Sequence, residues 1–219
     1  MKKATHTKFY AVRVGRKTGI FLTWEECKAQ TWGYQNGVFR AFTTREEAYI
    51  WLGDTEKVIN SGGCRIFTDG SHQRAQDYLG MGAWCRWEDT EFWYSKKITR
   101  ELLNSYGISE ESECSNPTAE FMAVVEILKK FEGRKLHTTL AIITDYVGVK
   151  HWMSGTWEAH EPHIIAVLKE CRRILTTITG TVTFEWVKGH SGNDGNNNAD
   201  KMAGSHDEID TFADLVPLV

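Results

Sequence analysis

Four carboxylates of this sequence stand where they could together hold divalent cations. Asp69 lies in TDGS at the predicted end of a strand, and Glu120 lies in the helix that NPTAE opens. Asp145 closes the apolar run LAIITD, and Asp200 lies in a predicted short helix, ten residues after His190. Carboxylate oxygens are hard ligands that suit Mg²⁺, and an imidazole can change charge near neutral pH. The four carboxylates together predict a metal centre. The loop around His190, taken by itself, is equally well explained as a solvated loop with an incidental histidine.

Glu120 carries the clearest positional signal of the four. At 100° per residue it shares a helix face with Val124, Ile127 and Phe131. An unpaired charge on an apolar face is costly, so a partner is expected. That partner is a metal ion or, alternatively, a buried salt bridge or the positive end of the helix dipole.

Composition favours an ordinary soluble globular protein of 219 residues. No apolar run is long enough to span a membrane, and the basic N-terminus lacks the apolar core of a secretory signal. The five cysteines form no CxxC pair, which favours an intracellular, reducing setting in the cytoplasm or nucleus. We therefore expect no membrane association, and a monomer.

Charge divides the chain unevenly. Residues 1–52 hold nine Lys/Arg against four Asp/Glu, a net +5, whereas residues 53–219 hold 17 against 25, a net −8. The basic part is suited to a polyanion, and the acidic part would repel one unless metal ions neutralised some carboxylates. We expect a small domain over 1–52, a polar linker over 53–63, a larger domain over 64–205 and a tail over 206–219. The tail could dock on the larger domain or bind a partner, and disorder is the default expectation.

Residue patterns predict strands and helices in both domains. In the small one, strands are expected over 8–14, 20–22 and 38–42, with helices opened by capping boxes at Thr23–Glu26 and Thr44–Glu47. In the larger one, strands are expected over 64–69, 81–87, 91–98, 140–145 and 182–187. Helices are expected over 117–131, with Asn116 as its cap, and over 162–177, whereas 99–115 is expected to be loop. The result is an α/β fold with a mixed sheet flanked by helices.

The ordered motifs TDGS, N-x-x-x-E, TD and GHSG-x-x-G-N-x-x-AD resemble type 1 ribonuclease H over roughly 64–205. Residues 1–52 resemble the small hybrid-binding domain (caulimovirus viroplasmin-like) that precedes some of these enzymes, through FYAVRVGRKTGIFLTWEECKAQ, VFRAF and TREEAYIWL. The resemblance implies a ribonuclease H-like fold, with a five-stranded mixed sheet, behind a small α+β domain. It also implies an endonuclease that cuts the RNA strand of RNA–DNA hybrids, giving 5′-phosphate and 3′-hydroxyl ends.

Site roles follow from this resemblance. Asp69, Glu120, Asp145 and Asp200 would hold two Mg²⁺, with Mn²⁺ as an alternative, and Asp69 and Asp145 would bridge ions and substrate. His190 would move a proton or help product leave, or alternatively bind phosphate. The expected hybrid contacts are Gly70, Ser71 and Asn116 in the larger domain and Tyr10, Arg16, Lys17, Trp24, Phe39 and Arg40 in the small one. Two alternatives stay open: Asn116 as a plain helix cap and Trp24 as a core residue.

Several residues depart from the family's usual pattern. Asn197 stands where Glu is common, Tyr146 where Ser is usual, Gly148 where an aromatic is frequent, and Ala41 where a second basic residue is typical. Segment 151–163 also lacks the lysine cluster of some relatives. Two rival functions therefore remain: a nuclease of the same fold acting on DNA, and a hybrid-binding protein without catalysis.

Overall fold

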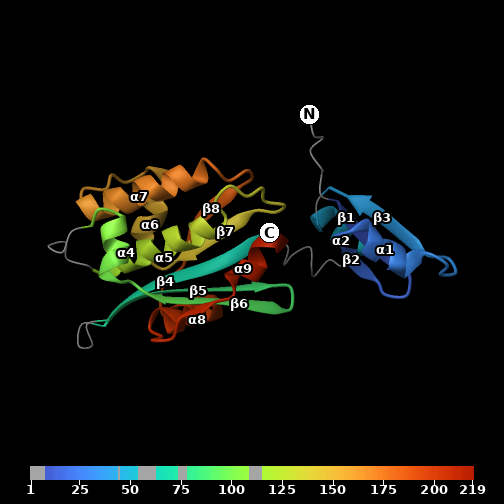
Figure 1. The fold of residues 1–219 in the computed structure, drawn as a ribbon, viewed down its shortest axis with the longest axis horizontal. Helices are drawn as coiled ribbons and strands as arrows, with labels where there is room; N and C mark the ends of the chain where they lie inside the picture. Colours follow the sequence, from blue (N-terminus) through green and yellow to red (C-terminus); the bar gives the residue numbers. More distant parts are fainter. Residues whose placement is uncertain (1–7, 44, 54–62, 74–77, 109–114) are drawn as a thin grey trace. The chain divides into compact units, whose positions relative to one another are not determined.

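A computed structural model gives the fold of residues 8–43, 45–53, 63–73, 78–108 and 115–219. Most of the predicted linker, Thr44 of the second capping box and Cys114 lie outside these ranges. The chain divides at Gly63/Cys64 into two compact units, each considered by itself (Figure 1). Among the described residues, no helix has the length and apolar character needed to cross a bilayer.

The first unit is a three-stranded antiparallel sheet in the order β2-β1-β3, with two helices. Its elements are β1 (Phe9–Val14), β2 (Gly19–Phe21), α1 (Trp24–Thr31), β3 (Val38–Phe42) and α2 (Arg45–Leu52). The predicted capping box is confirmed, because Thr23 accepts from the Glu26 backbone and Glu26 accepts from the Thr23 backbone. Successive residues of β1 face opposite sides, so Phe9 and Ala11 pack with Ala48 of α2.

The second unit holds a mixed sheet in the order β8-β7-β4-β5-β6-β9. Its strands are β4 (Cys64–Gln73), β5 (Tyr78–Trp87), β6 (Thr90–Lys97), β7 (Leu140–Thr144), β8 (Val182–Trp186) and β9 (Ile209–Asp210). Strands β4, β7 and β8 are parallel, and the pairs β4–β5, β5–β6 and β6–β9 are antiparallel. The expected mixed sheet is therefore confirmed, with a two-residue sixth strand added at the β6 edge.

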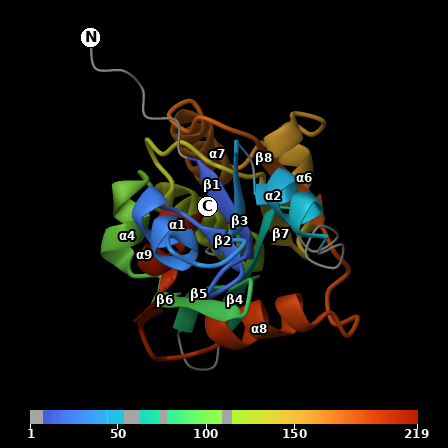
Figure 2. The ribbon, with the colours of Figure 1, turned by 90° about the vertical axis from the view of Figure 1, so that its right-hand side faces the viewer.

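Helices cover both faces of this sheet. They are α4 (Arg100–Ser105), α5 (Asn116–Lys130), α6 (Val147–Ser154), α7 (Pro162–Leu175), α8 (Asp194–Ala203) and α9 (Phe212–Leu215), followed by the 3₁₀ helix η2 (Val216–Leu218). Helix α5 packs on β4 and β5 and contacts α7, whereas α8 covers the opposite face of β4 and β5 (Figures 1 and 2). The main core lies between the sheet and α5.

Three predicted boundaries need correction. Strand β4 does not end at Asp69, as the expected range 64–69 had it, but continues in register with β5 to Gln73, so Asp69 lies inside the strand. The cap of α5 is Ser115, and Asn116 is already helical. The expected loop over 99–115 contains α4, which forms because the Thr99 hydroxyl accepts from the Leu102 backbone and Leu103 is buried.

Of the expectations for 206–219, the default of disorder is wrong and docking on the larger domain is confirmed, because this segment completes the core of the second unit. Strand β9 pairs with β6, and Lys130 forms an ion pair with Asp210. Phe212, which is fully buried, meets Tyr94 edge-on with ring centroids 6.4 Å apart. The apolar residues of the tail therefore seal one edge of the sheet.

Replacing Phe212 by Ala should lower the free energy of unfolding of the second unit by about 3–5 kcal/mol, because the change leaves a cavity in a packed core. Denaturant unfolding followed by tryptophan fluorescence measures this. The exposed Asp214→Ala, two residues away, serves as control and should stay within about 0.5 kcal/mol of the parent. Equal stability of both variants would show that the tail is not part of the core.

Candidate carboxylate centre

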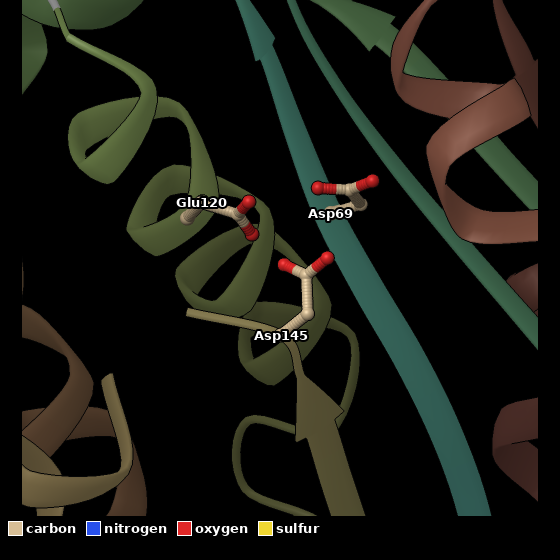
Figure 3. Close-up of side chains that lie close together, drawn as sticks. All are labelled: Asp69, Glu120 and Asp145. Atoms are coloured by element: carbon tan, nitrogen blue, oxygen red, sulfur yellow. The ribbon is translucent and has the colours of Figure 1, made fainter. Parts of the chain in front are cut away.

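Three carboxylates from three elements meet at one corner of the second unit. Ligand oxygens of Asp69, Glu120 and Asp145 all lie within 4.8 Å of one another (Figure 3). Asp69 comes from the middle of β4, Glu120 from the first turns of α5 and Asp145 from the residue after β7. Three of the four predicted ligands are thus brought together by elements far apart in the sequence.

A glycine in β4 allows α5 to come this close. A Cβ added at Gly70 would lie 2.1 Å from the backbone nitrogen of Glu120 and 2.2 Å from the carbonyl carbon of Ala119. No side chain fits there, so the backbone of α5 rests directly on the strand. Gly70 therefore sets the distance between Asp69, its neighbour in the chain, and Glu120.

Glu120 is buried without a cationic partner among the described residues. It is 6% exposed, and the Thr144 hydroxyl lies 3.5 Å from its Oε2. Burial, followed by the charges of Asp69 and Asp145, raises its pKa well above the ordinary value. A buried salt bridge, the alternative to a metal ligand, is not present in the described part of the chain.

Asp69, like Glu120, is a buried carboxylate with a raised pKa. Burial raises its pKa from 3.8 to about 7, and the charges of Asp145 and Asp200 add to this effect. Hydrogen bonds from Glu120 and from the Gly70 N–H, which lies 2.8 Å from Oδ1, act in the opposite direction. A raised pKa means that Asp69 tends to keep its proton, because the ionised carboxylates repel one another. A divalent cation would instead stabilise their ionised forms.

Asp145 is held from both its backbone and its side chain. The Trp186 indole Nε1 donates to the Asp145 carbonyl oxygen at 2.9 Å, and Asn196 Nδ2 donates to Oδ2 at 3.1 Å. A Cβ added at Gly189 would lie 2.6 Å from the same Oδ2, so this glycine also leaves room for the carboxylate. The sequence patterns did not single out Trp186, and they included Thr144 and Asn196 only as fixed positions of the TD and GHSG-x-x-G-N-x-x-AD motifs, without a role of their own. For Asn196, the available signal was its place one helical turn before Asp200.

Asp200 and His190 lie outside the triangle of three acids. Asp200 is exposed on α8, yet its charge contributes to the raised pKa of Asp69, so it faces the same corner. His190 is exposed in the turn before α8, with a positive φ of 50°. Neither residue therefore belongs to the cluster of three acids.

The expected hybrid contacts of the second unit differ in their surroundings. Gly70 and Ser71 continue β4 beyond Asp69, and the Gly70 N–H is already directed at the Asp69 carboxylate. Asn116 is exposed, and Ser115 occupies the cap position that was its alternative role. The side chain of Asn116 is therefore not needed to begin the helix.

Three aromatic rings of the first unit form one cluster. Trp24 lies with its ring centroid 5.3 Å from that of Phe39 and 5.9 Å from that of Tyr10. Trp24 is 37% exposed and Phe39 is 41% exposed, so Trp24 is not a core residue. The cluster offers an apolar surface to solvent.

The basic side chains of the first unit are arranged differently. Arg40 is exposed and lies over the Phe42 ring, 5.4 Å from its centroid. Lys17 is exposed in the turn between β1 and β2, whereas Arg16 bonds the carbonyl oxygens of Ala29 and Trp32. Arg16 therefore stabilises the C-terminal end of α1. This structural contact was not part of its expected role in phosphate binding.

Two departures from the family pattern, Tyr146 and Gly148, are sterically coupled. A Cβ at position 148 would lie 2.4 Å from the Tyr146 ring, so Gly148 leaves the space that Tyr146 occupies. The Tyr146 ring packs against Trp152, with centroids 5.6 Å apart. The remaining departures, Ala41 and Asn197, are both exposed. None of these residues displaces a carboxylate of the corner.

In segment 151–163, α6 ends at a left-handed Gly155, after which Trp157 stacks on His151 with ring centroids 4.2 Å apart. The Thr156 hydroxyl bonds His151 Nδ1 at 2.7 Å. This turn presents a half-exposed tryptophan where some relatives carry lysines.

An α/β sheet with clustered carboxylates beside its central parallel strands is an arrangement suited to metal-dependent chemistry on phosphates. Residues 62–207 match the RNase H family, and residues 8–52 match the ribonuclease H1 N-terminal domain. The chain therefore belongs to the ribonuclease H family and is a nuclease of that class.

The chain is similar to several proteins of known name. Ribonuclease H1 of Rattus norvegicus is 26% identical over 251 residues, covering 89% of this chain and 87% of its own. Ribonuclease H of Saccharomyces cerevisiae is 44% identical over 59 residues, covering 27% of this chain and 17% of its own. Among solved structures, RNase H1 from Halobacterium salinarum is 17% identical with a TM-score of 0.47, covering 64% of this chain and 92% of its own.

Replacing Gly70 by Ala should lower kcat about 100-fold, because the added methyl group must push α5 and Glu120 away from β4. Thermal unfolding measures the accompanying loss of stability, about 1–3 kcal/mol from overpacking. In the control Gly204→Ala, the nearest atom to the new Cβ is the flexible Nε2 of Gln73 at 3.3 Å, so activity should be nearly unchanged. Full activity of the Gly70 variant would contradict the spacing role.

Stability should depend on pH in opposite ways without and with metal. In EDTA, the unfolded Asp69 loses its proton near pH 3.8 and the folded one near pH 7, so its contribution to the free energy of unfolding falls between these values. Mg²⁺ binds the ionised carboxylates, so its stabilising effect should increase as pH rises through about 7. Thermal unfolding from pH 5 to 8.5 measures both effects.

The Asp69→Asn variant is the control for this pH dependence. It lacks the titrating carboxylate, so it should lose part of the slope in EDTA and most of the stabilisation by Mg²⁺. An Mg²⁺ effect that is the same at pH 5.5 and 8.5 in the parent chain would contradict the assignment of the corner as a cation site.

Proposed function

We propose that this chain hydrolyses the RNA strand of RNA–DNA hybrids, with two Mg²⁺ ions, or Mn²⁺ in their place, and leaves 5′-phosphate and 3′-hydroxyl ends. The observation that carries this proposal is the cluster of Asp69, Glu120 and Asp145, within 4.8 Å of one another and mostly buried, in a chain of the ribonuclease H family. Relatives with both parts of the chain are themselves described as ribonuclease H1.

The donor set fits Mg²⁺. It consists of hard carboxylate oxygens from rigid elements. When ionised, these carboxylates repel one another, and no cationic side chain among the described residues neutralises their negative charge. Asp69, Glu120, Asp145 and Asp200 would hold the ions, with Asp69 and Asp145 contributing to both the ions and the substrate. When bound, the ions supply the positive charge that activates a water and stabilises the leaving oxygen in an in-line displacement.

The protein's own residues position this chemistry. Trp186 and Asn196 fix Asp145, Gly70 fixes the distance from β4 to α5, and the Thr144 hydroxyl restrains Glu120. His190, on an exposed turn, would accept or return a proton at the leaving oxygen, or assist product release. Phosphate binding by His190 without proton transfer is the alternative that kinetics would distinguish.

Selection of RNA in a hybrid requires contact with the 2′-hydroxyl. The backbone of Gly70 and Ser71 continues β4 beside Asp69, which supports a contact near the scissile phosphate. Asn116 is exposed at the start of α5, only four residues before Glu120, and is free of capping, which supports a contact in the minor groove. These three residues would therefore read the sugar next to the cleaved bond.

The first unit would hold the hybrid near the catalytic unit. The cluster of Tyr10, Trp24 and Phe39 would pack against the sugar-phosphate backbone, and Lys17 and Arg40 would neutralise phosphates. Ala41 in place of a second basic residue reduces the charge of β3, so affinity would depend more on the aromatic cluster. Tethering then raises the effective concentration of substrate.

One labelled sequence, presented as RNA–DNA hybrid, RNA duplex and DNA duplex with Mg²⁺, Mn²⁺ or EDTA, tests this function. Cleavage should need metal, occur only in the RNA strand of the hybrid, and leave ends that a ligase requiring 5′-phosphate accepts. Asp145→Asn should bind hybrid as the parent does and lose at least about 100-fold in kcat, because a corner ligand is removed.

Each rival function has its own outcome in this experiment. Cleavage of DNA duplex would support a DNA nuclease of the same fold. Tight hybrid binding without cleavage under either metal would support a binding protein, with Asn197 and Tyr146 as the first residues to revert. Full turnover by Asp145→Asn would refute the metal-site assignment itself.

A further inference from the structure

Asn196 is a buried amide between the carboxylate corner and helix α8. It is 2% exposed, and its Nδ2 donates to Asp145 Oδ2 at 3.1 Å. Its backbone N–H donates to Oδ1 of Asn193, the N-cap of α8, at 3.0 Å. One residue thus joins the first turn of α8 to the end of β7.

The orientation of this amide follows from its partner. An ionised carboxylate only accepts hydrogen bonds, so the NH₂ group of Asn196, and not its oxygen, must face Asp145. Its Oδ1 is then buried with no hydrogen-bond partner among the described residues. A buried polar atom left in this way is costly, and a residue chosen only for packing would not leave one.

Helix α8 is packed closely enough to keep this contact short. A Cβ added at Gly195 would lie 2.4 Å from the Phe67 ring, and one added at Gly82 would lie 2.2 Å from the Ala203 nitrogen. Both ends of α8 therefore rest directly on β4 and β5. Asp200 lies four residues after Asn196, one helical turn along the same helix, so the two side chains face the same side.

We propose that Asn196 is a positioning residue that orients the Asp145 carboxylate for cation binding and keeps α8, with Asp200, in register with the other three acids. This inference rests on the proposed function, because it assumes that the corner binds divalent cations. Asn196 acts through Asp145 and does not itself hold an ion. Removing its amide frees the Asp145 side chain to turn away from Asp69 and Glu120.

The experiment is Mn²⁺ binding by calorimetry on the full chain, with no hybrid present, for the parent, Asn196→Ala, Asp145→Asn and the double variant. Asn196→Ala should weaken Mn²⁺ binding about 10–100-fold, the usual effect of removing a residue that orients a metal ligand. In the Asp145→Asn background the same change should have less than about a two-fold effect, because its target is gone. The half-buried Asn198→Ala, on the same helix, is the matched control and should bind Mn²⁺ as the parent does.

Thermal unfolding in EDTA accompanies each measurement. If Asn196→Ala fails to fold, Asn196→Ser keeps a polar group in the first turn of α8, is too short to reach Asp145, and should show the same loss. Parental Mn²⁺ affinity in a folded Asn196 variant would overturn the proposal and leave a packing role only. Equal losses in both Asp145 backgrounds would overturn it too. A parent chain that binds no Mn²⁺ would instead refute the cation site of the proposed function.

Discussion

The packing of the second unit must overcome one repulsion, between the carboxylates that it holds in a buried corner. Asp69, Glu120 and Asp145 come from separate elements, and each would move apart if its backbone allowed. The fold prevents this by close backbone contact: α5 rests on Gly70, and α8 rests on Gly82 and Gly195. These contacts thus hold together carboxylates whose mutual repulsion is relieved by protonation and would be relieved further by a bound cation.

The same reasoning explains which predictions from sequence succeeded. The capping box of Thr23 and Glu26 depends on residues three apart, and the apolar run 140–144 forms a central strand because both its faces are covered. The four acids were found because their residue types and order are distinctive. Local patterns and a chemical motif therefore suffice to predict a feature when residues close in the sequence determine it.

Other features depend on contacts that the sequence does not display. An Asp-Gly pair usually favours a turn, but α5 packs on Gly70 and β5 pairs with it, so β4 continues to Gln73. Ser115 and Asn116 are both good capping residues, and only the packing of α5 selects the first. Asn196 is one of three successive asparagines and a fixed position of the loop motif, but its contact with the Asp145 side chain became visible only with the fold.

The segment that seals the β6 edge affects the order in which the two units can form during translation. Strand β9, helix α9 with Phe212, and η2 complete the second unit, and these three elements follow all the others of that unit in the chain. On the ribosome, the first unit leaves the exit tunnel complete while the second still lacks part of its core. A nascent chain would thus present the folded first unit, to which hybrid binding is assigned in the proposed function, before the second unit is complete.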